Sequence, residues 1–334
     1  MFRITSIVLA SSLLILTQFA QAAETIVIYS GRSDNFVKPV INQFSEQTGI
    51  NVVLHAGAST ALLNKLSIEG ARTDADLFLS NDAGTLQKGA ELGLFAQIPA
   101  AIANQVAPNY RAPDNSWVGL SARARVLVIN THNPLAKNLN SVFDLADPKL
   151  KGQVGITNST NESYIAGATV YLLAAGREKT SRWLQGLKDN VGGRVFDKHG
   201  MIVKSVASGK LAAGLVNHYY IYRHLDENPN ASIAIVLPDQ GKDGIGVAWN
   251  VAGIAITKHS KKRELAEQLI RYLVSAEGQQ LFAGANREYP TREGVAASAG
   301  LPAAGSFKVA DVPMYRLGTM RNETIDLIEA VGMP

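Results

Sequence analysis

Residues 117–130 read Trp-Val-Gly-Leu-Ser-Ala-Arg-Ala-Arg-Val-Leu-Val-Ile-Asn, a pattern that predicts one long β-strand. A strand of this length often crosses from one domain into another. Residues 248–256 form a second long apolar strand and are the candidate return crossing. Together these stretches predict two lobes that are joined by two crossing strands.

Strands and helices alternate before the first crossing, in the order strand 25–29, helix 35–48, strand 51–54, helix 62–68, strand 76–80 and helix 86–94. This alternation predicts a parallel sheet with helices on both faces. Ligands of such sheets bind beyond the carboxyl ends of the strands. Residues Ser30–Asp34 and Asn81–Asp82 lie at those positions.

The rest of the chain continues the α/β pattern. Strand 154–156 and strand 211–216 lie between the crossings, with helices at 164–175, 179–187 and 201–208, and helices at 263–273, 277–282 and 322–331 follow the return. We therefore expect residues 24–122 and 257–334 to form an N-terminal lobe and residues 123–256 a C-terminal lobe. Each lobe is expected to be a mixed sheet flanked by helices.

Composition places the chain among globular proteins and limits the kinds of partner that are expected. It has 334 residues, of which 46% are hydrophobic, and this length usually means two domains. The net charge of +4 is spread along the sequence with no Lys/Arg-rich run, so nucleic-acid binding is not expected. A mild positive charge fits a cleft that receives an anion.

The N-terminus and the absence of cysteine indicate an exported protein. Residues 1–22 have a signal-peptide layout, with Arg3, an apolar stretch at 4–19, and Ala20-Gln21-Ala22 as the cleavage site. The chain contains no cysteine, which excludes disulfides, thiolate metal sites and cysteine nucleophiles. A mature periplasmic protein after cleavage is therefore expected.

An adjacent tyrosine pair follows the strand at 211–216. The sequence Leu-Val-Asn-His-Tyr-Tyr occupies residues 215–220, where a strand is expected to pass into a helix. In the first turn of a helix, neighbouring side chains splay by roughly 100° and can converge on one point. Oxygen ligands select hard metals, so two phenols suit a hard trivalent cation. An aromatic pair in a core, or a lid over a pocket, is the alternative.

A polar turn and two arginines are candidates for anion binding. Residues 157–163 read Thr-Asn-Ser-Thr-Asn-Glu-Ser and open the helix at 164–175. The N–H groups at a helix start bind anions, although such residues also serve simply as caps. Arg123 and Arg125 lie on one face of the strand at 117–130, where they need an anionic partner or solvent.

Several motifs resemble those of the periplasmic ferric-iron-binding proteins, or bacterial transferrins, of ABC iron importers, and the resemblance covers nearly all of the mature sequence. These motifs are Tyr-Ser-Gly-Arg (29–32), Ala-Asp-Leu-Phe (75–78), Trp-Val-Gly-Leu-Ser-x-Arg-x-Arg (117–125), Leu-Val-Asn-x-Tyr-Tyr (215–220), Ala-Glu-Gly-Gln-Gln (276–280) and Glu-Tyr-Pro (288–290). The resemblance implies the two-lobed α/β fold of a type II periplasmic solute-binding protein, which closes by hinge motion. It also implies an inner-membrane ABC permease as partner, no enzymatic activity, and a monomer.

The same resemblance implies a site for Fe(III) and a synergistic anion, carbonate or phosphate. Tyr219 and Tyr220 match the phenolate ligands, and Tyr164 is the candidate for a third tyrosine that some members have. The expected anion contacts are Arg32, Arg123, Asn161, Glu162, Ser163 and Asn217. The first lobe departs from the family pattern, because Ser33, Asp34 and Asn81 stand where members often have stronger ligands.

Two other functions remain open from the sequence. The same fold can bind an organic or oxyanion solute, such as a phosphonate, thiosulfate or a polyamine, without metal. An exported hydrolase is a weaker alternative, because the sequence contains no Gly-x-Ser-x-Gly motif. The six histidines show no metal-ligand spacing, and His218 is expected to face away from the site.

Overall fold

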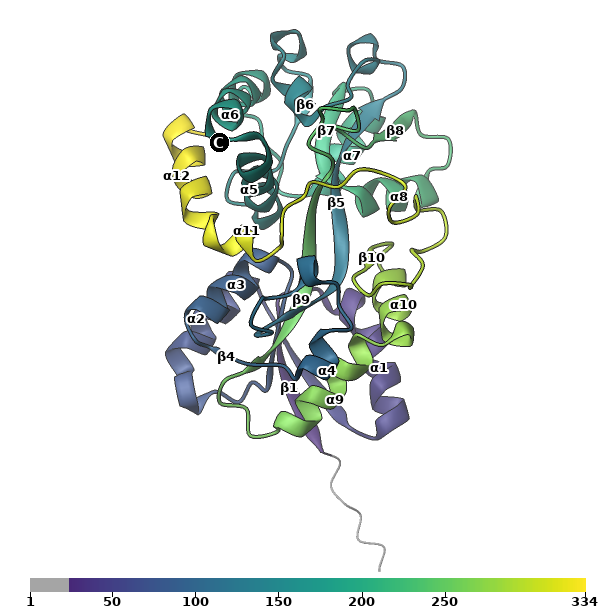
Figure 1. Ribbon diagram of the computed structural model, residues 1–334. Coiled ribbons are helices and arrows are strands. Elements are labelled where there is room, and N and C mark those ends of the chain that lie inside the picture. Colours follow the sequence, from purple (N-terminus) through teal and green to yellow (C-terminus); the bar gives the residue numbers. More distant parts are fainter. Residues whose placement is uncertain (1–23) are drawn as a thin grey trace, which may run out of the picture.

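Residues 24–334 are described by a computed structural model, and the predicted signal peptide at 1–22 lies outside these residues. Figure 1 shows two lobes, with long strands running from one to the other. No helix in the described part of the chain is long and apolar enough to cross a membrane.

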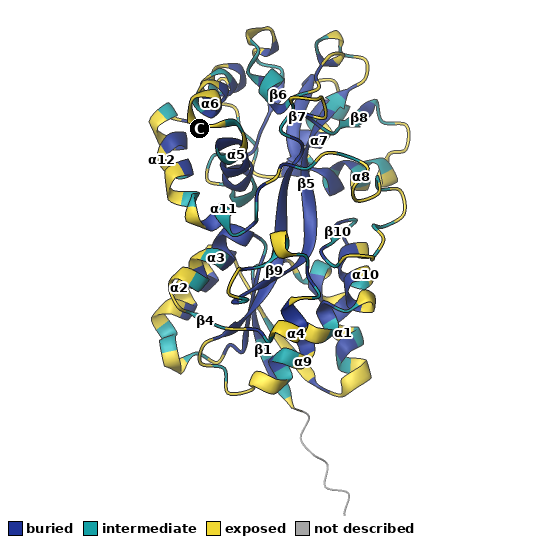
Figure 2. Ribbon diagram, viewed as in Figure 1, coloured by how far each residue is buried: buried dark blue, intermediate teal, exposed yellow. Residues whose placement is uncertain are grey.

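The two long strands predicted from the sequence connect the lobes. They are β5 (Val118–Asn130) and β9 (Ala248–Thr257), which pair antiparallel from Val118 with Ile254 to Arg125 with Ala248. The strand order is β2-β1-β3-β9-β5-β7-β6, so one sheet continues through both lobes. In Figure 2 both strands are dark blue, because nearly all of their residues are buried.

The N-terminal lobe begins with alternating strands and helices, as expected. Its elements are β1 (Thr25–Ser30), α1 (Asp34–Thr48), β2 (Asn51–Ala56), α2 (Ser59–Glu69), β3 (Leu77–Ser80), α3 (Ala83–Glu91), β4 (Phe95–Ala96) and α4 (Ala100–Ala103). Strand β1 pairs in parallel with β2 and β3. Gly31 follows β1 because the turn passes very close to α2, where an added Cβ would lie 2.1 Å from Ser59 Oγ.

The C-terminal lobe lies between the crossings. Its elements are β6 (Val154–Gly155), α5 (Glu162–Ala175), α6 (Arg177–Val191), α7 (His199–Ala207), β7 (Ala213–Asn217), α8 (His218–Glu227) and β8 (Ile233–Val236). Strand β7 pairs antiparallel with β5, and β6 pairs in parallel with β7. The sequence did not predict β8, which pairs with β5.

The chain after the return crossing consists mainly of helices. It contains α9 (Arg263–Leu273), α10 (Ala276–Gly284), β10 (Tyr289–Pro290), α11 (Arg316–Thr319) and α12 (Arg321–Val331). Short 3₁₀ helices occur at Gly70–Arg72, Pro108–Tyr110, Pro134–Ala136, Val142–Ala146 and Pro148–Leu150.

Helix α12 differs from the expected lobe division. We expected all of residues 257–334 in the N-terminal lobe, but α12 packs against α5 and α6 (Figure 1). Its Thr324 hydroxyl lies 3.0 Å from that of Thr169 on α5. Chain order alone does not determine which apolar surface covers such a terminal helix, and here that surface belongs to residues 123–256.

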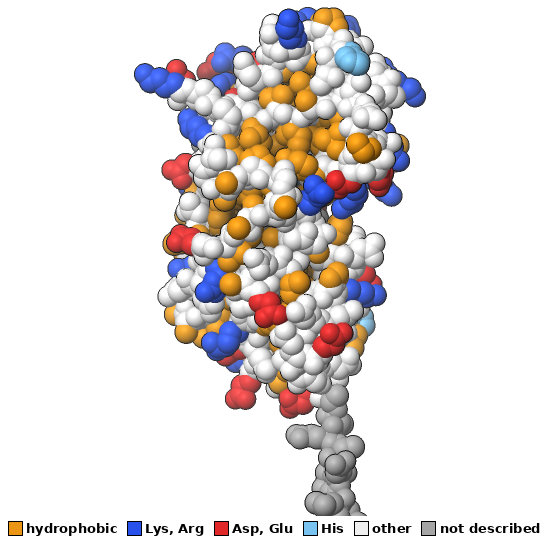
Figure 3. Space-filling view, turned by 90° about the vertical axis from the view of Figure 1, so that its right-hand side faces the viewer, with side chains coloured by type: hydrophobic (Ala, Val, Ile, Leu, Met, Phe, Trp, Pro, Cys, Tyr) orange, Lys and Arg blue, Asp and Glu red, His pale blue; other side chains and the backbone are white. Residues whose placement is uncertain are grey.

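Apolar groups form much of the surface where the lobes meet on one side. Figure 3 shows hydrophobic side chains gathered across the middle and upper part of the face that includes α8, β10 and α10, with charged side chains mainly around them. Beneath the surface, the apolar core contains Phe44 and Phe282 in the N-terminal lobe and Trp183 in the C-terminal lobe.

Candidate functional site

The tyrosine pair lies at a junction between a strand and a helix, as the sequence predicts. Strand β7 ends at Asn217 and α8 begins at His218, so Tyr219 and Tyr220 occupy the first helical turn. Their ring centroids are 4.6 Å apart with an angle of 38° between the ring planes. Tyr219 is buried and Tyr220 is partly exposed, so the pair lies at the edge of the core.

Asn217 connects Tyr219 to the start of α5 and to β5. Its Nδ2 donates to the Tyr219 hydroxyl at 3.2 Å and to Ser163 Oγ at 3.3 Å. Its Oδ1 accepts from Arg125 Nη1 at 3.4 Å. Because Arg125 can only donate, it fixes the amide orientation and turns the NH₂ group toward Tyr219. A donor in this position stabilises a phenolate more than a phenol.

His218 faces away from the pair's hydroxyl groups, as expected from the sequence. Its Nδ1 accepts from the backbone N–H of Ala124 at 3.2 Å, and its Nε2 donates to the carbonyl of Arg287 at 2.7 Å. Burial lowers the pKa of His218 to about 4, so the ring is neutral at pH 7. Both ring nitrogens are occupied, which leaves neither available to a metal.

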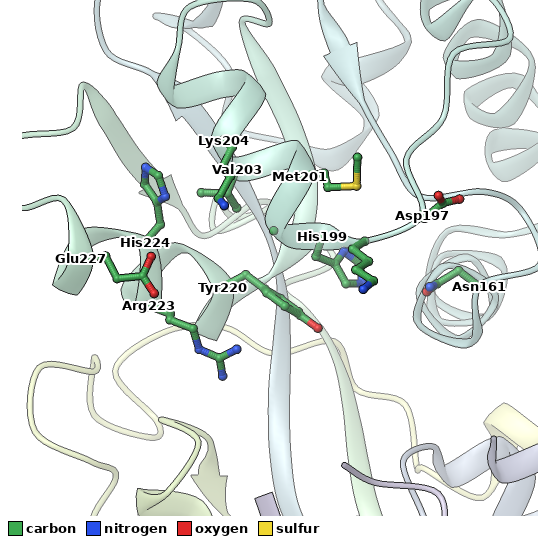
Figure 4. A pocket seen from close by; sticks show the side chains of 12 residues that line it. Asn161, Asp197, His199, Met201, Val203, Lys204, Tyr220, Arg223, His224 and Glu227 are labelled. Atoms are coloured by element: carbon green, nitrogen blue, oxygen red, sulfur yellow. The ribbon is translucent and has the colours of Figure 1, made fainter. Parts of the chain in front are cut away.

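Two side chains next to Tyr220 were not identified from the sequence. The His199 ring centroid lies 5.1 Å from that of Tyr220, and Arg223 Cζ lies 5.8 Å from the Tyr220 ring centroid. Figure 4 shows Tyr220 between them. Burial, and then the neighbouring Tyr219, raise the pKa of Tyr220, whereas Arg223 lowers it. The i,i+3 spacing of Tyr220 and Arg223 on a helix is the signal that would have identified the arginine.

These side chains line a cavity of about 380 Å³ between α7 and α8. Lys198 and Lys204 contribute positive charge, while Asp197 and Glu227 contribute negative charge. Arg223 Cζ also lies 5.3 Å from the ring centroid of Phe36, which belongs to α1 of the N-terminal lobe. Arg223 therefore contacts an aromatic ring on each side of the lobe junction.

Arg123 and Arg125 are both buried on β5. Arg123 Nη2 donates to the carbonyl of Asn81, which follows β3 in the N-terminal lobe. Arg125 Nη1 contacts the His199 ring as well as Asn217. Desolvation lowers the pKa of Arg125 to about 10, so its guanidinium is charged at pH 7. Both arginines lie beside the residues expected to bind an anion.

The polar turn before α5 is used largely for capping. The Asn161 side chain accepts from the backbone N–H groups of Ser163 and Tyr164, at 3.0 and 3.3 Å. Glu162 accepts from Thr60 of the N-terminal lobe at 3.3 Å, and burial raises its pKa. Ser163 is the turn residue that contacts Asn217.

Arg32, which was expected to contact the anion, is paired with a carboxylate in the structure. Arg32 Nη2 forms a buried ion pair with Glu288 at 3.1 Å, and the Ser121 hydroxyl donates to the same carboxylate. Its guanidinium also lies 5.5 Å from the Phe36 ring centroid and 5.2 Å from that of Phe282. Because a carboxylate already compensates its charge, Arg32 has no need of a bound anion.

Tyr164 is buried, and Asp34 of the first lobe is paired with a lysine. The Tyr164 hydroxyl is buried without a hydrogen-bond partner among residues 24–334, and burial raises its pKa. Asp34 forms an ion pair with Lys38 at 2.8 Å. The described residues contain no group of three or more His, Cys, Asp and Glu that could hold a metal. Tyr219 and Tyr220 are the predicted ligands that the structure places next to each other.

Comparisons with known proteins identify the family. The family of bacterial extracellular solute-binding proteins matches residues 40–309, which is most of the chain. The chain belongs to this family. Its members are solute-binding proteins, and this family's type II fold agrees with the α/β architecture predicted from the sequence.

Relatives of this solute-binding protein include named iron-binding proteins. It is 32% identical over 302 residues to iron uptake protein A1 of Synechocystis, covering 88% of this chain and 83% of the relative. It is 28% identical to the Fe(3+)-binding periplasmic protein of Serratia marcescens, covering 97% of this chain and 96% of the relative. A Trichodesmium FutA structure in complex with iron and citrate has a TM-score of 0.83 and 29% identity, covering 93% of this chain and all of that one.

Replacing Glu288 with alanine should strongly destabilise the protein, because it leaves Arg32 charged and buried without its partner. Breaking a buried pair costs about 3–5 kcal/mol in the free energy of unfolding. Denaturant unfolding of the iron-free protein measures this loss. The control is Glu178→Ala, which removes an exposed pair with Arg182 and should cost less than about 1 kcal/mol. Equal losses in the two variants would contradict the importance of the buried pair.

Proposed function

We propose that this chain is the periplasmic substrate-binding component of an ABC importer for ferric iron. It captures Fe(III) with the phenolates of Tyr219 and Tyr220 and delivers it to an inner-membrane permease. The observation that carries the proposal is the convergence of these two phenols at the start of α8. The names of relatives that match 88% and 97% of the chain support iron as the solute.

The chemistry of the pair suits Fe(III). Phenolate is a strongly donating oxygen ligand, and hard cations select oxygen. The amide of Asn217 donates to Tyr219 and would stabilise its ionised form. Two phenolates leave one positive charge on the ion and most of its coordination positions free. A small anion and water are the proposed remaining ligands.

A carbonate or phosphate bound near the α5 N-terminus would supply that anion. Ser163 and Asn217 are in hydrogen-bond contact with each other, and Arg123 lies on the adjacent strand and lines the same cavity as both. Asn161 and Glu162 would lie next to this anion. The Asn161 side chain caps α5, and the Glu162 side chain accepts a hydrogen bond from Thr60. Arg32 and Tyr164 are left out of the proposed site, because one is paired with Glu288 and the other is buried.

The remaining proposals concern compartment and assembly. A cleaved signal peptide at residues 1–22 would export the protein to the periplasm, where it acts as a monomer. An organic or oxyanion solute without metal is the competing function, and the iron-binding names of the relatives at 32% and 28% identity favour iron over it. Visible absorption separates the two, because charge transfer from phenolate to Fe(III) is coloured.

Tyr219→Phe and Tyr220→Phe should each keep ring packing and lose iron affinity. Changes outside the coordination sphere cost about 10–100-fold in metal affinity, so loss of a ligand should exceed about 100-fold. Titration with ferric citrate, followed by visible absorption and a competing chelator, measures both colour and affinity. Tyr222→Phe is the matched control on the same helix. A variant of the pair that retains full colour and affinity would remove that tyrosine from the site.

Iron affinity should rise with pH, because each phenol must lose a proton on binding. Burial raises the pKa of Tyr220, so its hydroxyl is protonated throughout the neutral range in the iron-free protein. Two released phenol protons give an increase of about two log units in affinity per pH unit. Chelator competition from pH 5 to pH 8 measures the slope.

The slope should fall by about one log unit per pH unit in either Tyr→Phe variant, since one proton fewer is released. A bound carbonate adds its own proton dependence, so the difference between wild type and variant is the informative quantity. Affinity that is independent of pH would contradict phenolate ligation.

A further inference from the structure

The cavity beside Tyr220 is larger than the proposed ligands of Fe(III) require. Its volume is about 380 Å³, and it lies between α7 and α8. A water molecule takes about 30 Å³ of liquid volume, so a small anion and water would fill only a minor part of this space. Pockets for small organic molecules have volumes of about 300–1,000 Å³. The cavity therefore has room for an organic ligand beside the phenol.

Part of the cavity lining is apolar or aromatic. Met201 and Val203 of α7 line the cavity, together with the rings of His199 and Tyr220 (Figure 4). Met201 is 48% exposed and is one of only four exposed large hydrophobic residues within residues 24–334. Methionine adapts its shape to a ligand, and its sulfur makes favourable contacts with aromatic rings. This lining favours a ligand with a flat aromatic ring over a purely polar one.

The charged side chains around the cavity leave a small excess of positive charge. Lys198, Lys204 and Arg223 line it, against Asp197 and Glu227, so three positive charges face two negative ones. None of these five side chains forms an ion pair within residues 24–334. The lining can therefore receive one carboxylate. A tricarboxylate would bring more negative charge than the lining offsets, and it has no apolar surface for the methionine and valine.

We propose that this cavity holds the aromatic ring of an iron chelator, a catechol that carries one carboxylate. Its two hydroxyl oxygens lose their protons to solvent, and as hard ligands they take Fe(III) positions that the proposed function gives to water. The ring contacts Met201 and Val203, and the carboxylate lies near Lys204. The iron stays ferric throughout. The inference rests on the proposed function, because the chelator reaches the metal that the tyrosine pair holds, and the importer would then accept iron that arrives with such a chelator.

Binding of 2,3-dihydroxybenzoate to the iron-loaded protein tests the inference. Protein loaded with Fe(III) in bicarbonate should retain one equivalent of this ligand in equilibrium dialysis, and its colour should change because catecholate adds a charge-transfer band of its own. Benzoate keeps the ring and the carboxylate but lacks the hydroxyl groups, so it should not be retained. No retention of 2,3-dihydroxybenzoate, or removal of the iron from the protein, would overturn the inference. Iron binding in bicarbonate alone is measured first and tests the proposed function separately.

Met201→Gln keeps the length of the side chain and removes its apolar character. It should weaken retention of 2,3-dihydroxybenzoate about 10-fold and leave iron affinity in bicarbonate alone unchanged. Leu92→Gln is the matched control, because Leu92 is 49% exposed and lies outside the cavity, and it should retain the ligand as the wild type does. Equal retention in the two variants would place the ligand elsewhere and would overturn the inference.

Lys204→Glu tests the recognition of the carboxylate. It should weaken retention of 2,3-dihydroxybenzoate about 5-fold, and it should change retention of catechol itself little, because catechol has no carboxylate. Lys210→Glu makes the same charge change at an exposed lysine outside the cavity and should affect neither ligand. Equal effects of Lys204→Glu on the two ligands would contradict the assignment of a carboxylate to this chelator.

Discussion

The pairing of β5 with β9 is the interaction on which the rest of the structure depends. The ladder runs from Val118–Ile254 to Arg125–Ala248 and is buried along its length. It carries one sheet through both lobes and fixes Arg123 and Arg125 in the C-terminal lobe. Because β7 pairs with β5 at Arg125–Asn217, the same ladder fixes the position of the tyrosine pair that follows β7.

The candidate ligands are concentrated in one lobe. Tyr219, Tyr220, Asn217 and Ser163 all belong to residues 123–256. The N-terminal lobe contributes the carbonyl of Asn81 and the ring of Phe36, neither of which carries a charge. An ion held by the C-terminal lobe alone would have unfilled coordination positions on the side that faces the N-terminal lobe. The small anion and water that we propose as additional ligands would fill these positions.

Local patterns made the fold and the tyrosine pair predictable from the sequence. The apolar runs at 117–130 and 248–256 became β5 and β9, and the strand before Asn217 placed the pair in a first helical turn. The pairing of Arg32 with Glu288 was not predictable, because the two residues are 256 positions apart in the sequence. The role of Asn161 was also undetermined, since a cap and an anion ligand use the same residue type. The burial of Tyr164 depends on the direction in which its side chain leaves α5. A shift of one residue in the sequence alignment turns that direction by about 100° around the helix axis.

Contacts of different strength cross between the lobes near the candidate site. Arg123 Nη2 donates to the Asn81 carbonyl in a charge-assisted hydrogen bond, and His218 Nε2 donates to the Arg287 carbonyl at 2.7 Å. Glu162 accepts from Thr60 at 3.3 Å, and Arg223 lies over Phe36 and Tyr220 at 5.3 and 5.8 Å. Partly exposed contacts of this kind are each worth about 1 kcal/mol or less. A ligand shifts an opening equilibrium only by its differential affinity for the two states. A ligand therefore changes the populations only if its extra affinity for the closed state is comparable with the free energy of the contacts that differ between the two states. Asn217 contacts Ser163, Tyr219 and Arg125, all within the C-terminal lobe, so a change in the angle between the lobes would leave these contacts of the candidate site in place.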